Sequence, residues 1–92
     1  MFMEVTLRRV PPDPNNSPVD GIRILAMLPR HWRTGLRRES GDVIIEVRLD
    51  ASATARAIRR EISRAIADPS VGDWEPAGSR FVPDAAWERG RR

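Results

Sequence analysis

The chain has 92 residues, of which 40% are hydrophobic and 32% charged, and it contains no cysteine. A chain of this length can build one hydrophobic core but not two, so we expect a single small domain over residues 1–92. Without cysteine there can be no disulfide, thiolate zinc site, iron–sulfur cluster or cysteine nucleophile. The sequence contains no apolar run near the roughly 18 residues of a membrane span. Residues 1–5 lack the pattern of a secretory signal, which favours the cytoplasm.

The net charge is only +3, yet the pI is near 11.2. All 16 basic residues are arginine, and arginine keeps its proton at any ordinary pH, so a small excess raises the pI far. The high pI therefore does not by itself indicate a strongly basic surface. Abundant arginine and alanine without lysine or tyrosine is also what a GC-rich bacterial genome would encode. The arginines thus have a functional and a purely compositional interpretation.

The first predicted element is a strand over residues 2–10. Met3, Val5 and Leu7 alternate with polar residues, which is the period of a half-buried strand. Prolines and turn-forming residues fill 11–19 and predict a loop. Residues 22–28 again alternate, and we expect a second strand, apolar on both faces, with Leu25 and Met27 on its second face.

Residues 30–38 have two interpretations. Pro29 could stand at the first position of a short helix. Alternatively, Trp32, Thr34 and Leu36 alternate as in a strand, and residues 39–42 form the turn of a hairpin.

Residues 43–49 and the segment that follows give the clearest pattern in the chain. Val43, Ile45 and Val47 alternate in a run of β-branched residues, which predicts a strand. Asp50 or Ser52 then serves as the N-cap of a helix over about residues 51–67. Its apolar stripe has helical spacing and consists of Ala55, Ile58, Ile62, Ala65 and Ile66. The pair at 68–69, Asp-Pro, ends the helix.

The last quarter of the chain has weaker signals. Residues 70–78 form an acidic, turn-rich stretch, and 79–82 a short strand with Phe81 facing the core. Residues 83–89 predict one or two helical turns, and 90–92 a frayed tail. Together these elements predict a two-layer α+β domain, in which an antiparallel sheet of about four strands carries one main amphipathic helix on one face.

Residues 36–82 resemble, in outline, the ubiquitin-like β-grasp fold. The resemblance rests on the β-branched strand at 43–49, which leads through an acidic cap into the helix. It implies a β-grasp-like arrangement of the strand and helix. The chain lacks a Gly-Gly terminus, so no conjugation role is implied.

Several catalytic chemistries lack the residues that they need. His31 is the only histidine, no serine stands in a Gly-x-Ser-x-Gly turn, and there is no lysine for a Schiff base. The aspartates are scattered beside turns and helix ends, where capping accounts for them. No glycine-rich turn precedes a helix to bind phosphate. We therefore expect no enzyme, no metal and no cofactor.

The three tryptophans lie in connections or near the C-terminus rather than at alternating core positions. Tryptophan is enriched where proteins bind one another. Trp32, Trp74 and Trp87, with Leu25 and Met27, are therefore the predicted contacts of a small protein–protein interaction module: an accessory subunit, adaptor or inhibitor. Its partner would be another protein or a second copy of itself, as a homodimer. The alternative is that the tryptophans close a small core.

Two further hypotheses concern other classes of function. The first is a nucleic-acid-binding regulator, because arginine binds phosphate with two parallel hydrogen bonds. Its predicted contacts are Arg30, Arg33, Arg37, Arg38, Arg56, Arg60 and Arg64. The second is a subunit of an enzyme whose site forms at an interface.

Overall fold

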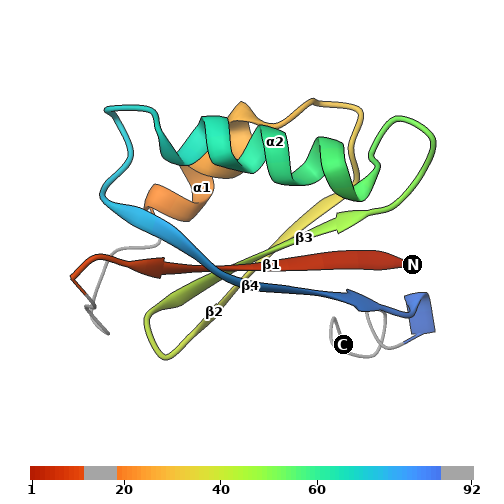
Figure 1. Ribbon diagram of the computed structural model, residues 1–92, viewed down its shortest axis with the longest axis horizontal. Helices are drawn as coiled ribbons and strands as arrows, with labels where there is room; N and C mark the ends of the chain where they lie inside the picture. Colours follow the sequence, from red (N-terminus) through yellow and green to blue (C-terminus); the bar gives the residue numbers. More distant parts are fainter. Residues whose placement is uncertain (12–18, 86–92) are drawn as a thin grey trace.

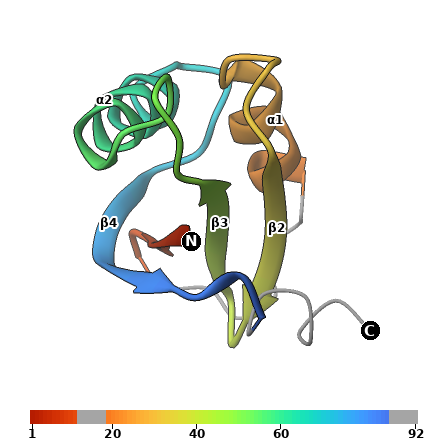
Figure 2. The same ribbon diagram turned by 90° about the vertical axis from the view of Figure 1, so that its right-hand side faces the viewer.

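The computed structural model describes residues 1–11 and 19–85. Its elements follow in the order β1 (Phe2–Arg9), α1 (Val19–Met27), β2 (Thr34–Glu39), β3 (Asp42–Arg48), α2 (Ala55–Ile66) and β4 (Trp74–Val82). The strands form one antiparallel sheet in the order β2-β3-β1-β4. Both helices lie on the same face of it (Figure 1), α2 on the β4 side and α1 on the β2 side (Figure 2). The predicted two-layer α+β fold is confirmed, with two helices in the described residues rather than one main helix.

The core lies between the helices and the two central strands. Alternate residues of β1 and β3 face the helices, among them Val5 and Ile45, which are paired in register. The helix α2 buries Ile58, Ile62 and Ala65 against them. The predicted apolar stripe of this helix is therefore confirmed.

The N-terminus of α2 differs from the prediction. The helix begins at Ala55, and its N-cap is Thr54, whose Oγ1 accepts a hydrogen bond of 3.2 Å from the backbone nitrogen of Ala57. Asp50 instead accepts from two backbone nitrogens, of Ser52 and Ala53, at 2.8 Å each, and these hydrogen bonds, with that of the Ser52 hydroxyl, lower its pKa. The predicted cap at Asp50 or Ser52 is wrong, because both residues favour turns as well as caps. Without an acidic cap, the β-grasp likeness loses the feature on which it rested.

Residues 22–27 belong to α1, so the predicted second strand is wrong. Gly21 and Ile24 bury one side of the helix, and Leu28, directly after its end, is buried at the next helical spacing, whereas Met27 is 38% exposed. A short apolar run fits both periods, and here leucine, alanine and methionine favour the helix. The glycine lets α1 approach β2, because a Cβ at Gly21 would lie only 3.0 Å from Cδ1 of Leu36.

For residues 30–38, the hairpin interpretation is confirmed. β2 and β3 pair in register from Thr34 to Glu39. The connecting residues Ser40 and Gly41 have φ angles of 52° and 87°. Positive φ at both central positions is typical of the two-residue turn whose twist matches that of the strands.

β4 is longer than the predicted strand at 79–82, because it begins at Trp74. Its register against β1 shifts between Thr6 and Leu7, which pair with Gly78 and Pro76, so that Ala77 is the extra residue of a bulge. Proline and glycine are turn signals in the sequence, but an edge strand tolerates both. Phe81 pairs with Met3 and so lies on the helix side as predicted, although it is 54% exposed. Of the predicted turns at 83–89 and the tail at 90–92, residues 86–92 lie outside the described residues.

Truncation of the helix stripe should destabilise the fold strongly. Ile58 and Ile62 are fully buried, so we expect Ile58→Ala and Ile62→Ala each to lower the free energy of unfolding by about 2–5 kcal/mol. The exposed Ser63 of the same helix is the control, and Ser63→Ala should change it by less than about 0.5 kcal/mol. Urea denaturation measures all three values. Losses below about 0.5 kcal/mol at both isoleucines would show that this helix face is not the core face.

Candidate functional site

The face of the sheet away from the helices carries a network of ion pairs. The carboxylate of Glu4, at the centre of β1, accepts hydrogen bonds from Nη2 of Arg37 on β2 at 2.8 Å and from Nε of Arg80 on β4 at 2.9 Å. Arg37 also reaches Glu39 at 2.9 Å and Glu46 on β3 at 3.5 Å. The network therefore joins all four strands across this face.

The carboxylate of Glu4 does not suit acid–base catalysis. The hydrogen bond from Arg80 and the positive charges of Arg80 and Arg37 hold the pKa of Glu4 below its ordinary value, although burial opposes them. A general acid or base at neutral pH needs a carboxyl pKa raised toward 7. We interpret the network as structural.

Leu25 and Met27, which we expected on the second face of a strand, do not lie on this face of the sheet. Leu25 and Met27 belong to α1, which lies on the opposite side of the sheet (Figure 2). Ile44 does face away from the helices but is only 6% exposed. The homodimer stays a prediction, without the surface on which it rested.

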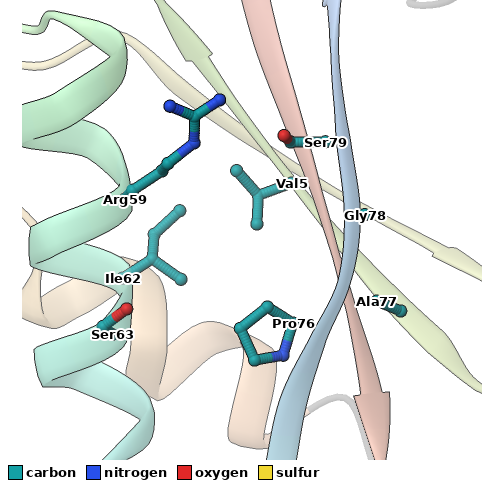
Figure 3. A pocket seen from close by; sticks show the side chains of 8 residues that line it. All are labelled: Val5, Arg59, Ile62, Ser63, Pro76, Ala77, Gly78 and Ser79. Carbon is teal, nitrogen blue, oxygen red and sulfur yellow. The ribbon is translucent and has the colours of Figure 1, made fainter.

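A groove of about 430 Å³ opens between α2 and β4 (Figure 3). It is lined by Val5, Arg59, Ile62, Ser63, Pro76, Ala77, Gly78 and Ser79. The groove exists because β4 has small side chains in its middle, Ala77, Gly78 and Ser79, and a bulge at the first of them. Its apolar part comes from Val5, Ile62 and the proline ring.

Arg59 is the only charged residue among the described residues that line the groove. Its side chain extends from α2 across the gap, and the Ser79 hydroxyl lies on the β4 side (Figure 3). Within residues 1–11 and 19–85, no carboxylate lies within ion-pair distance of this guanidinium. By contrast, the neighbouring Arg60 and Arg64 lie 3.5 Å and 3.6 Å from the carboxylate of Glu61.

Two backbone hydrogen bonds show which residues of β1 face which neighbouring strand. Leu49 donates to the Met1 carbonyl at 2.9 Å on the β3 side, and Val10 donates to the Asp73 carbonyl at 2.8 Å on the β4 side. The backbone groups of successive strand residues point to opposite sides. Odd-numbered residues of β1 therefore bond to β3, and even-numbered residues bond to β4.

The same alternation identifies the unpaired groups of β4. Arg80 and Val82 pair with even-numbered residues of β1 and bond to them. The N–H and C=O groups of Ser79 and Phe81 therefore point to the outer edge, where residues 1–11 and 19–85 form no further strand. Pro76, opposite the odd-numbered Leu7, also turns its nitrogen outward, so its missing N–H costs no bond to β1.

Two of the three tryptophans belong to the core. Trp32 and Trp74 are each 7% exposed and pack in the main cluster, so the prediction that they lie outside the core is wrong for both. Trp74 also donates from Nε1 to Oδ2 of Asp20 at 3.0 Å, and the Arg9 guanidinium lies 6.0 Å from its ring centre. Trp87 lies outside the described residues.

The structure divides the seven arginines predicted to contact nucleic acid. Arg37 faces away from the helices, in the ion-pair network, whereas the stripe at 56, 60 and 64 lies on the exposed side of α2. Arg30 and Arg33 are exposed in the connection between α1 and β2, and Arg38 is exposed on β2. The sheet thus separates the side chain of Arg37 from the helix stripe, and the seven do not form one continuous surface.

Sequence reasoning missed the groove and its charged residue. Arg59 was outside the predicted arginine stripe, which followed the spacing of four through 56, 60 and 64. Helical spacing does contain a signal, because Arg59 and Ser63 lie one turn apart, beside the buried Ile62. Nothing local connects this pair to β4, which lies further along the chain.

Comparison with protein-family models, curated proteins and solved structures found no match to this chain. The described residues contain no group of three or more histidine, cysteine, aspartate or glutamate side chains that could hold a metal ion. None of the helices in that part of the chain is long and apolar enough to cross a membrane.

The ion-pair network should make stability depend on pH through Glu4. Because the pKa of Glu4 is lowered in the folded state, its contribution is fully present above the pKa of an unfolded glutamate, about 4.3. It is lost as the pH falls through the lower folded pKa. We expect Glu4→Gln to be less stable than the parent at pH 7, with a difference that shrinks in acid.

Urea denaturation between pH 7 and pH 3 measures this difference. Glu39→Gln is the control, because Glu39 is an exposed member of the same network and exposed pairs contribute little. A difference between parent and Glu4→Gln that stays constant over the whole range would contradict the assignment.

Proposed function

We propose that this protein is a non-enzymatic protein-binding module that takes an extended segment of a partner protein as a further strand beside β4. The observation that carries the proposal is that the backbone groups of Ser79 and Phe81 lie beside the groove at the edge of the sheet and have no partner strand in the part of the chain that the structure describes. In this mode of recognition, main-chain hydrogen bonds give affinity and pockets for alternate side chains give specificity.

The opposite edge of the sheet, formed by β2, lacks space beside the strand for the side chains of a bound segment. β2 has six residues against nine in β4. At β2, α1 packs closely, since a Cβ at Gly21 would meet the side chain of Leu36 at 3.0 Å. A segment added there would find hydrogen-bonding groups but little room beside them for its side chains.

The lining of the groove also favours binding over catalysis. As far as the structure describes the chain, the lining contains two serines and an arginine but no histidine, cysteine, aspartate or glutamate. A serine nucleophile needs an adjacent base, and the lining supplies none. A chain without cysteine suits the reducing cytoplasm, where we place this activity.

Binding beside β4 should depend on alternate backbone groups of the ligand. Eight-residue peptides are selected from a random displayed library on the folded protein, and the best is synthesised with single N-methyl groups. Only alternate N–H groups of a strand bond to one neighbour. Methylation at the odd-numbered or at the even-numbered positions of the peptide, whichever set faces β4, should therefore weaken binding about tenfold or more. Methylation of the other parity should change it less than about twofold. Fluorescence anisotropy measures both.

Two variants at one position test the protein side of the same contact. Ser79→Pro removes an N–H that does not bond to β1 and should abolish peptide binding, whereas Ser79→Ala keeps that N–H and should retain it. The amide spectrum of each variant checks its fold. Failure to select any peptide, or equal losses at both methylation parities, would overturn the proposal.

A further inference from the structure

We infer that the segment bound beside β4 carries an acidic side chain that pairs with Arg59, next to an aliphatic side chain that enters the groove. The partner is thus an extended acidic segment of another protein. The inference rests on the proposed function, because β4 must first align the segment along the groove.

Among the described residues that line the groove, Arg59 alone is charged. Arg80 on β4 bonds to Glu4, and Arg64 on α2 lies beside Glu61, whereas Arg56 forms no ion pair with the described residues but does not line the groove. Arg59 has no such carboxylate partner among the described residues. Its side chain lies beside the apolar part of the groove lining. A cation in this position is attracted to an anion that the ligand brings.

The groups around Arg59 match a carboxylate in kind as well as in charge. The Ser79 hydroxyl lies across the gap on β4, whereas Ser63, one helical turn from Arg59, lies beyond Ile62 from the guanidinium (Figure 3). A guanidinium donates two parallel hydrogen bonds to a carboxylate, and a hydroxyl can donate one more. A carboxylate near the β4 side of the gap would therefore have donors on both sides.

The apolar part of the groove lining limits the size of the ligand side chain that lies next to the acidic one. Val5, Ile62 and Pro76 form an apolar surface within a groove of about 430 Å³. This is near the lower end of the roughly 300–1,000 Å³ typical of small-ligand sites. The space suits one or two side chains of an extended chain rather than a helix, and aliphatic ones gain most from burial there.

A second copy of this chain fits the charge of the groove poorly through the same edge. The one acidic residue of β4, Glu75, pairs with Arg8 and so lies on the face away from the helices, and from Pro76 to Val82 the strand contains Arg80 but no acidic residue. Pairing β4 with β4 of a second copy would bring no carboxylate from that stretch to Arg59. Charge complementarity therefore favours a different protein as the partner.

Charge reversal at Arg59 tests the inference, with Arg64→Glu as the matched control. Arg64 lies on the same helix, has a highly exposed side chain and does not line the groove. Peptides are selected on the parent and on both variants. We expect aspartate or glutamate at one shared position on the parent and on Arg64→Glu, and arginine or lysine at that position on Arg59→Glu.

The best acidic peptide then measures the size of the effect by anisotropy. Arg59→Glu should weaken it about tenfold or more, since one charge-assisted pair becomes a repulsion, and Arg64→Glu less than about twofold. The peptide with that acidic residue changed to lysine should recover binding to Arg59→Glu. If the amide spectrum shows that this variant misfolds, Arg59→Gln replaces it and should lose the acidic preference.

The contradicting outcomes separate this inference from the proposed function. Two outcomes would refute the role of Arg59 and leave the proposed function intact. One is that peptides keep the alternating effect of N-methylation but show no acidic preference, and the other is that both charge reversals weaken binding equally. Loss of the parity effect together with displacement by a 12-nucleotide single strand would refute both, in favour of nucleic acid. A dimer at about 100 μM protein that the acidic peptide does not dissociate would make the second copy the occupant and refute the inference.

Discussion

The alternation of β1 is the constraint on which the rest of the structure depends. This strand pairs on both sides, so its side chains contribute to both faces of the sheet and its backbone serves both neighbours. Val5 and Leu7 face the helices and form the middle of the core. Glu4 faces the other way, and its carboxylate accepts hydrogen bonds from Arg37 and Arg80. The same alternation directs the backbone groups of β1 to β3 and β4 in turn. At the outer edge of β4, the backbone groups of Ser79 and Phe81 therefore have no partner strand among the described residues.

The sequence predicted the elements in which one period is unambiguous. β1, β3 and the stripe of α2 carry long regular patterns, and all three were located correctly. Residues 22–28 were misassigned because a seven-residue stretch with six apolar residues satisfies both periods, and the choice depends on the packing of Gly21 against Leu36. The first part of β4 was hidden by Pro76 and Gly78, whose turn preference is overridden at an edge strand. Trp74 looked like a loop residue only because its strand had been missed.

The candidate site could not be predicted from the sequence, for a different reason. Its lining combines Val5 near the N-terminus, residues 59–63 of α2 and residues 76–79 of β4, and no local pattern connects segments so far apart. The arginines illustrate the same limit. Their number suggested one basic surface, but the topology turned Arg37 into the partner of Glu4 on one face and left Arg59 beside the groove on the other.

The two helices meet the two edges of the sheet differently, and the chemistry of the facing residues explains why. At β2, Gly21 removes the helix side chain, so α1 can approach Leu36 with only apolar atoms in contact. At β4 the small side chains lie on the strand, and α2 turns Arg59 and Ser63 toward them. Closing that gap would remove the guanidinium from water without a partner, which costs far more than burying a few apolar atoms gains. The open groove therefore leaves the exposed guanidinium of Arg59 in water, and the proposed acidic segment would bring the anion that pairs with it.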